Sequence, residues 1–241
     1  MTAAPKSRQE AQPAYVLHSW PFRETSLVVE VFSQNFGRLA LVARGARRPR
    51  SAVRGLLLAF QPLHLGWFGK TELRTLHNAE WQGGQPLLQG PALICGFYLN
   101  ELLLKLLPRE DPHEQLFLHY RDALQALARD PAHAAVLRRF EVRLLQELGY
   151  APAFDREADS GAAIETDAVY HYVFEHGPSL RGGRRDSVQL RGKTLLDMAD
   201  DDYRDPLTQQ QSKMLMRALL NHHLGEQTLH TRQMLRELQE F

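Results

Sequence analysis

The chain is poor in cysteine and in long apolar stretches. Its 241 residues contain one cysteine, Cys95, which excludes an intramolecular disulfide and a zinc site made of several cysteines. Cys95 lies within an apolar helical pattern, so we interpret it as a small buried residue rather than a nucleophile. No apolar stretch is long enough to cross a bilayer, and the N-terminus lacks the apolar segment of a secretory signal. We therefore expect a cytoplasmic protein without membrane contact.

The sequence also lacks the common signatures of enzymes. It contains no P-loop, no GxGxxG after a strand, no HExxH pair and no nucleophile elbow. The acidic triplet Asp200, Asp201 and Asp202 is typical of a solvated turn, because consecutive side chains point in different directions whereas two-metal catalysis needs convergent carboxylates. A metal-dependent nuclease or phosphotransferase is an alternative that rests on this triplet alone. We expect no enzymatic activity and no cofactor.

What the chain does contain is an uneven distribution of charge. The whole sequence has 29 lysines and arginines against 28 acidic residues, but residues 1–84 hold eleven of the basic residues and only five of the acidic ones. The remainder is acidic in balance. This asymmetry indicates an anionic partner for the first third of the chain and a different role for the rest.

The basic residues are most concentrated in the segment from residue 44 to residue 54, RGARRPRSAVR, which contains no acidic residue. Its glycine, proline and serine predict a loop between two strands. Guanidinium groups match phosphate geometry, so we predict a nucleic-acid backbone as the ligand; a merely solvated charged loop is the alternative. The predicted DNA-binding residues are Arg38, Arg44, Arg47, Arg48, Arg50, Arg54, Lys70 and Arg74. Aromatic residues nearby are expected either to stack on bases or to pack in the core or at a hairpin tip: Phe32, Phe36, Trp67 and Phe68.

The first third of the sequence is typical of strands bounded by turn residues. In SLVVEVFS, residues 26–33, apolar side chains alternate with a period of two. We expect strands at residues 15–20, 26–33, 38–43, 56–67 and 72–81. Five short strands match the size of an OB-fold barrel, although an SH3-like barrel has a similar pattern. We therefore predict a disordered leader over residues 1–13 and an OB-fold DNA-binding domain over residues 14–82.

After residue 83 the pattern changes to helical, which together with the strands predicts an α+β fold. Pro91, Asp111 followed by Pro112, and Asp130 followed by Pro131 mark three helix starts, and Gly149 marks an end. Residues 208–223 and 231–240 are expected to be helical again. We predict a mainly helical C-terminal domain over residues 83–241, with a small strand and loop insertion at residues 150–192.

Two of the predicted helices carry a possible protein-binding surface. Phe117 and Arg121 lie four residues apart, and Arg138 and Arg139 begin the following helix. An apolar slot beside arginines suits an acidic, partly apolar peptide tail. The alternative is that these arginines only confer solubility and pair with neighbouring acidic residues.

Two segments of the chain resemble the RecO family of bacterial recombination mediators. The first, AYVLHSWPFRETSLVVEVFSQNFGRLALVARGARRPRS, has the RETS segment, the G-R-L strand and the A-R-G-A-R loop. The second comprises LICGFYLNELLLKLLPREDPHEQLFLHYRDAL and LRRFEVRLLQELGYAPAFD, with the patterns Y-x-x-E-L and R-x-F-E-x-x-L-L-x-x-L-G-Y. The resemblance covers residues 14–155 well and the remainder loosely.

The resemblance implies an N-terminal OB fold and a helical C-terminal domain. It also implies a protein that binds single- and double-stranded DNA, anneals complementary strands and, with RecR, helps to load RecA onto DNA coated by single-strand binding protein. Carried over, Arg38, Arg44, Arg47, Arg48 and Arg50 contact phosphates. The C-terminal tail of the single-strand binding protein docks near Phe117, Arg121, Arg138 and Arg139. We accordingly expect association with the nucleoid.

One part of the chain departs from the family pattern. Many members carry a four-cysteine zinc module after the L-G-Y segment, but this chain has Asp155, Arg156, Glu157 and Ser160 there. We predict a zinc-free insertion, packed by Tyr170, Tyr172 and Phe174. The alternative to a DNA-binding mediator is an adaptor that mainly contacts proteins, with weak DNA binding; salt-sensitive strand annealing by the isolated protein separates the two.

Overall fold

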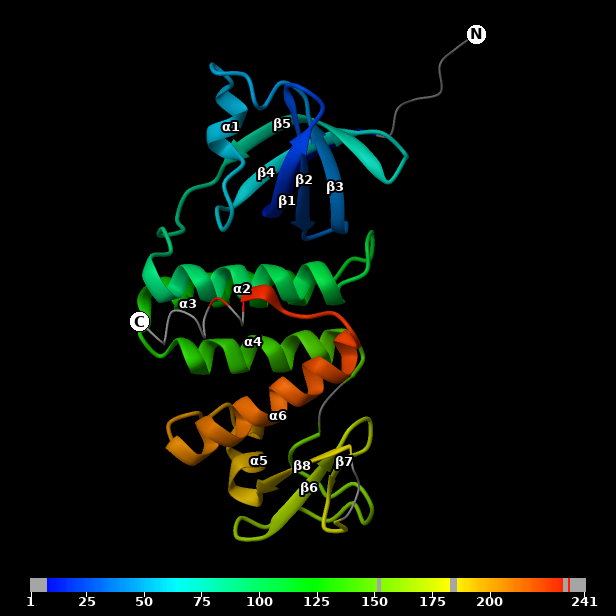
Figure 1. Ribbon diagram of the computed structural model, residues 1–241, viewed down its shortest axis with the longest axis vertical. Helices are drawn as coiled ribbons and strands as arrows, with labels where there is room; N and C mark the ends of the chain where they lie inside the picture. The colour runs from blue at the N-terminus through cyan, green and yellow to red at the C-terminus, as the bar shows by residue number, and fades with distance from the viewer. Residues whose placement is uncertain (1–7, 151–152, 183–185, 232–233, 235–241) are drawn as a thin grey trace. The chain divides into compact units, whose positions relative to one another are not determined.

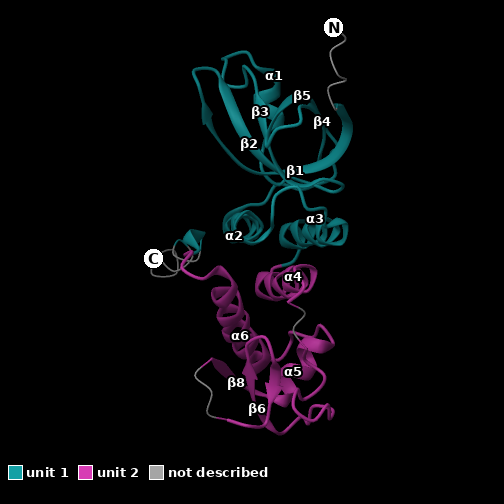
Figure 2. Ribbon diagram, turned by 90° about the vertical axis from the view of Figure 1, so that its right-hand side faces the viewer, with its two compact units in different colours: residues 1–130, 229–241 teal, residues 131–228 magenta. Residues whose placement is uncertain are grey.

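The computed structural model describes residues 8–150, 153–182, 186–231 and 234. Contacts divide the chain into two compact units, residues 1–130 with 229–241 and residues 131–228 (Figure 2). The boundary lies within the helical region and not at the change from strands to helices near residue 83. The first two long helices therefore belong to the same unit as the barrel, which differs from the domain limits expected from the sequence.

The first unit contains a closed five-stranded barrel, which confirms the expected OB fold (Figure 1). Its strands are β1 (Arg8–Phe22), β2 (Ser26–Ser33), β3 (Gly37–Ala43), β4 (Leu63–Phe68) and β5 (Leu73–Trp81). Their order is β1-β2-β3-β5-β4, and β1 closes the barrel by pairing with β4. Only the β3–β5 pair is parallel.

The barrel interior follows from the alternation seen in the sequence. Val29 pairs with Leu41 and Val31 with Leu39 across β2 and β3, and all four side chains are buried in the barrel core. Because successive side chains of a strand point to opposite faces, the residues between them face outward. Trp67 fills the core from β4 and is 1% exposed.

Two local expectations for this unit were wrong. Strand β1 begins at Arg8 and pairs with β4 from there, so residues 8–13 are not a disordered leader. Residues 56–67 are not a single strand, since the chain first forms the short helix α1 (Ala52–Leu56) and β4 begins only at Leu63. Between them, Phe60 has a positive φ of 67° and is buried, and Pro62 cannot donate a ladder hydrogen bond.

Helices α2 (Gly90–Leu106) and α3 (Glu114–Arg129) pack on each other. Helix α2 also packs on β1, and the Phe117 ring of α3 contacts Tyr15 and Phe32 on the outer side of the barrel. Helix α3 begins two residues later than the predicted start at Pro112, because the preceding residues extend the barrel edge. The Glu110 N–H donates to the Arg38 carbonyl at 2.9 Å. Gly37, with φ of 64°, passes so close to Asp111 that a Cβ would lie 2.1 Å from its carbonyl oxygen.

The second unit contains three helices and a small sheet: α4 (His133–Glu147), β6 (Val169–Val173), β7 (Gly177–Ser179), β8 (Ser187–Arg191), α5 (Gly192–Ala199) and α6 (Pro206–Leu224). The strand order is β7-β6-β8, and Tyr170 and Tyr172 are buried beneath it as expected. Gly149, at φ of 83°, follows the end of α4 as predicted.

For the C-terminal part, one outcome departs from the sequence expectations and one expectation is mostly untested. Helix α5 was missed, and it begins at Gly192, where a Cβ would lie 1.9 Å from the Glu165 carbonyl oxygen. The expected last helix at residues 231–240 lies mostly outside the described residues. Within the part that the structure describes, no helix is long and apolar enough to cross a membrane.

Candidate nucleic-acid interface

The arginine loop between β3 and α1 has a fixed base and exposed side chains. Ala46 is fully buried in the barrel core, which anchors the loop at its centre. Arg44, Arg47, Arg48, Arg50 and Arg54 are all exposed. The structure thus places five guanidinium groups at one end of the barrel, and they carry no ion pair among the salt bridges found in the described chain.

Arg47 has an additional role at the base of this loop. Its Nη1 atom donates to the carbonyl oxygens of Arg23 and Glu24, each at 3.2 Å, and its backbone N–H donates to the Thr25 carbonyl at 2.9 Å. These three residues form the turn between β1 and β2. The arginine loop is therefore fastened to the β1–β2 turn.

Arg38 and Arg74 are held inside the protein by carboxylates. Arg38 Nη1 lies 2.6 Å from Glu30, which also accepts from Arg109 at 2.9 Å. Arg74 pairs with Glu110 at 3.0 Å. The Arg38 and Arg74 side chains are only 15% and 14% exposed. The structure favours a structural role for both, whereas Lys70, at the tip between β4 and β5, is exposed like the loop arginines.

None of the four aromatic residues considered from the sequence is displayed for base stacking. Phe32 is fully buried against Phe117, and Trp67 lies in the barrel core with the edge of Phe36 against it, their ring centroids 5.3 Å apart. Phe68 is half-buried beside the ring of His77. The packing interpretation therefore describes these residues: Phe32 and Trp67 are buried, Phe36 packs against the core, and Phe68 packs at the hairpin tip. Other aromatic residues of the barrel are exposed, namely His18 and Trp20 on β1 and Trp81 on β5, and the sequence analysis missed them.

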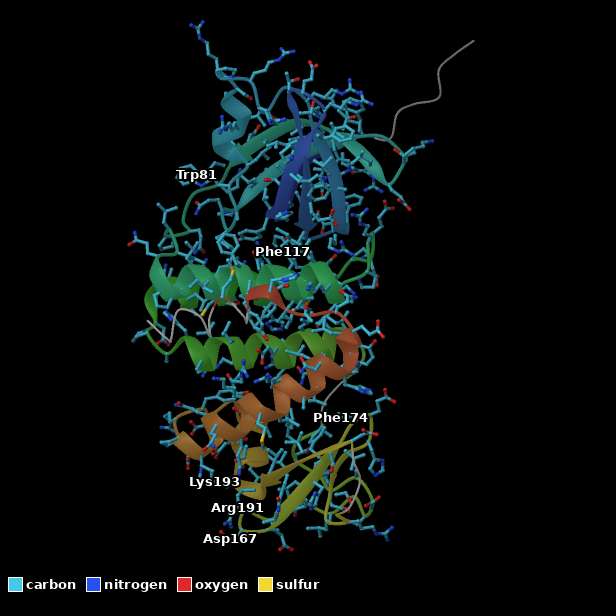
Figure 3. All side chains as sticks on the ribbon, in the orientation of Figure 1. Trp81, Phe117, Asp167, Phe174, Arg191 and Lys193 are labelled. Carbon is cyan, nitrogen blue, oxygen red and sulfur yellow. The ribbon has the colours of Figure 1, made fainter. Side chains whose placement is uncertain are left out.

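The residues expected to bind a peptide tail do not form an open slot around Phe117. Its ring is 5% exposed and packs on Tyr15 at 5.4 Å, on the barrel side of its helix (Figure 3). Arg121, one turn later on α3, pairs with Asp122 at 3.0 Å. The apolar residue predicted for the slot is thus part of the core of the first unit.

The other two residues of that set lie on α4, in the second unit. Arg138 pairs with the fully buried Glu141 at 2.5 Å, so it is a structural residue. Arg139 pairs with Asp201 at 2.8 Å and lies over the ring of Tyr203. Arg139 lines a hollow of about 420 Å³, whose wall also includes Val142, Arg143, Phe154, Met198 and Tyr203.

The acidic triplet is not arranged as a metal site. Asp201 pairs with Arg139, while the two carboxylate oxygens of Asp202 accept from Arg204. These hydrogen bonds lower the pKa of Asp202. Across the described residues, no group of three or more histidine, cysteine or acidic side chains is placed to hold a metal ion.

The segment that replaces the zinc module is closed by hydrogen bonds. Glu157 is 4% exposed and accepts from the Ser160 hydroxyl at 2.5 Å and from the Ser160 and Leu180 N–H groups. Asp159 accepts from the Ser179 hydroxyl at 2.6 Å and lies 3.0 Å from His176 Nε2. All four carboxylate oxygens have partners. These side chains do not fit the four-thiolate site of the family.

Comparison with known proteins agrees with both halves of the structure. Residues 8–84 match the family profile described as recombination protein O N terminal, and residues 87–233 match the one described as recombination protein O C terminal. The chain belongs to the RecO family. Membership places it among the proteins of DNA repair and recombination.

Individual RecO relatives are similar over nearly their whole length. A DNA repair protein RecO from Nitrosospira multiformis is 60% identical over 237 residues, which cover 98% of each chain. The relatives of the same name from Dechloromonas aromatica and Azoarcus sp. are 56% and 54% identical, and the alignments cover 98% of this chain. The RecO resemblance recognised in the sequence is thus confirmed.

Proposed function

We propose that this chain binds single- and double-stranded DNA through its arginine loop, anneals complementary strands and, with RecR, helps to load RecA onto DNA covered by single-strand binding protein. The observation that supports this most is a group of five exposed guanidinium groups, four on a loop fastened to the barrel and the fifth, that of Arg54, on the adjoining helix α1. The protein acts by binding and catalyses no reaction of its own. It is expected to be found with the nucleoid.

The mechanism is electrostatic. Arginines that neutralise the phosphates of two strands lower the repulsion between them, so the strands pair without a nucleotide cofactor. Binding releases condensed counterions, and its affinity therefore falls with rising salt. Arg44, Arg48 and Arg50 are exposed, and among the described residues no side-chain hydrogen bond or ion pair holds their guanidinium groups on the barrel. We therefore expect these groups to follow a phosphate backbone.

The direct test is to change Arg44, Arg48 and Arg50 together to alanine and to measure DNA affinity over a range of salt. Arg47 is left in place because it fastens the loop. We expect weaker binding and a slope of log K against log salt that is smaller by about 2 to 3. A matched control changes the exposed Arg129, Arg156 and Arg217. An unchanged slope in the loop variant would rule out the loop as the phosphate-binding element.

For the tail of the single-strand binding protein, the hollow beside Arg139 is the best docking place. Arg139 and Arg143 supply positive charge, while Val142, Phe154 and Met198 supply an apolar wall. A tail carboxylate would take the place of Asp201 as the partner of Arg139. Arg139→Ala should weaken binding of a fluorescent peptide of that tail about tenfold, with Arg129→Ala as the control.

The second candidate function is an adaptor with weak DNA binding, and this same hollow is the observation that favours it. Annealing of complementary oligonucleotides by the isolated protein discriminates between the two. A mediator should anneal them faster at low salt than at high salt, and the loop variant should lose this activity. An adaptor should leave the spontaneous annealing rate unchanged.

A further inference from the structure

Three aromatic side chains follow one another at alternate positions on β1: His18, Trp20 and Phe22. Their partners on β2 are Glu30, Val28 and Ser26. Val29 and Val31 alternate with these partners along β2, and their side chains point into the barrel core. The three rings therefore lie on the outer face of the barrel, because cross-strand partners share a face.

A β-bulge turns this row outward. Val16 pairs with Val31 and points into the core, and by simple alternation His18 and Trp20 would follow it inward. The register shifts between Val16 and His18, so Leu17 is an extra residue in β1. Bulges re-aim the side chains that follow them. The Leu17 carbonyl is held by the Asn100 side chain at 2.8 Å, which fixes the bulge from α2.

Two of the rings are exposed, those of His18 and Trp20, and the Phe22 ring is half-buried. His18 and Trp20 are stacked, with ring centroids 5.8 Å apart and planes 28° from parallel. Trp20 is 38% exposed and His18 is exposed. The guanidinium of Arg23 lies over the Phe22 ring, 5.2 Å from its centroid. A row of flat rings that ends in a cation offers surfaces for stacking, and every nucleobase has a π face to match.

The row is continuous with the arginine loop. It runs into the β1–β2 turn, whose carbonyl oxygens at residues 23, 24 and 25 accept from Arg47. Strands β1 and β2 lie side by side and lead to this turn (Figure 1). Cationic groups for phosphates and rings for bases therefore occupy the same end of one barrel. This is the combination that single-stranded nucleic acid requires.

We propose that His18, Trp20 and Phe22 form a stacking platform for the unpaired bases of single-stranded DNA. The inference rests on the proposed function, since the arginine loop supplies the phosphate contacts. The platform adds a preference for single-stranded over double-stranded DNA, which the arginine loop alone does not give. Bases in a duplex are already stacked and cannot use the platform, whereas unpaired bases can.

The test compares Trp20→Ala with wild type on three probes of equal length: a thymine oligonucleotide, an abasic strand and a duplex. We expect the thymine strand to bind about tenfold more weakly, because stacking on one aromatic residue contributes on that scale, and the other two probes to change less than about twofold. Trp20→Phe should retain most of the affinity. The control is Trp81→Ala, which removes another exposed indole (Figure 3). The Trp81 indole N–H donates to the Gln61 side-chain oxygen at 3.0 Å.

The outcomes separate this inference from the proposed function. An unchanged affinity for the thymine strand, or an equal loss on all three probes, overturns the platform, because the latter marks a structural role for Trp20. If wild type binds none of the probes, the proposed function fails and the platform with it. If the loop variant binds normally while Trp20→Ala loses only the thymine strand, the platform stands and the loop assignment fails. Thermal unfolding of each variant establishes that it is folded.

Discussion

Arg38 and Glu30 form an ion pair of 2.6 Å on the outer side of the barrel, with the Glu30 side chain 2% exposed. Arg109, on the segment between α2 and α3, closes on the same carboxylate. The Arg38 Nε atom also donates to the Leu107 carbonyl at 2.9 Å. An arginine that the sequence predicts as a phosphate ligand thus joins the barrel to the segment that follows α2.

This ion pair predicts that replacing Arg38 affects stability, whereas replacing the exposed Arg48 affects DNA binding. Arg38→Ala leaves the buried Glu30 carboxylate with one partner fewer, and we expect a loss of about 3 kcal/mol in the free energy of unfolding with little change in the salt slope of DNA binding. Arg48→Ala should leave stability unchanged and reduce the slope. Urea unfolding and salt titration measure the two effects. If the Arg38→Ala protein is as stable as wild type and its salt slope is reduced, Arg38 contacts phosphates and its structural role is wrong.

A second prediction concerns Asn100, which connects α2, α3 and the barrel. Its side chain donates to the Leu17 carbonyl at 2.8 Å and accepts from the Tyr120 hydroxyl at 2.5 Å. Both residues are buried. Asn100→Leu leaves two buried polar groups without this partner and should cost about 3 kcal/mol, while Tyr120→Phe should cost about 1 kcal/mol. If the double variant loses as much free energy of unfolding as the two single variants added together, the hydrogen bond between Asn100 and Tyr120 contributes nothing to stability.

A third prediction concerns acid stability. Burial alone would raise the pKa of Glu101, but hydrogen bonds from Thr231, Lys105 and His230 outweigh it and lower the pKa to about 2. The ionised carboxylate therefore stabilises the folded protein fully above pH 4.5, the ordinary pKa, and this contribution is lost as the pH falls towards 2. Glu101→Gln should remove up to about 3 kcal/mol at pH 7 and much less at pH 3.

The measurement for Glu101 is urea unfolding at both pH values, with the exposed Glu72→Gln as the control. Glu101 accepts from the backbone N–H groups of His230 and Thr231 at 2.8 and 2.9 Å. The variant should therefore also expose the chain near residue 230 to protease at pH 7. Equal destabilisation at both pH values would mean that the carboxylate charge is not the cause.

A fourth prediction concerns the segment that replaces the zinc module. Hydrogen bonds from Ser160 lower the pKa of Glu157, and those from Ser179 and His176 lower the pKa of Asp159. Their stabilising effect is present above the ordinary carboxyl pKa and is lost as the pH falls below it. Glu157→Gln should lower the Tm at pH 7, unlike Glu165→Gln, whose side chain is exposed. A zinc chelator should leave the Tm of the wild type unchanged. A lower Tm with the chelator would contradict the conclusion that hydrogen bonds, and not zinc, hold this segment together.

The sequence by itself determined the classes of structure and the position of the exposed arginine loop. Period-two alternation at residues 26–33 specified β2, proline starts and Gly149 located the helices within a few residues, and the arginine loop was found because no local pattern could bury it. These signals are local, since they depend on backbone geometry over a few residues.

Only the tertiary structure decided which side chains remain available. Arg38 is enclosed through Glu30 and through Arg109, 71 positions further along the chain, and Phe117 is buried by Tyr15 and Phe32 from distant strands. The bulge at Leu17 reverses the facing of His18 and Trp20, yet the sequence of β1 has no glycine to mark it. Pairing partners and strand register are set by packing between segments far apart in sequence, which a local pattern does not encode.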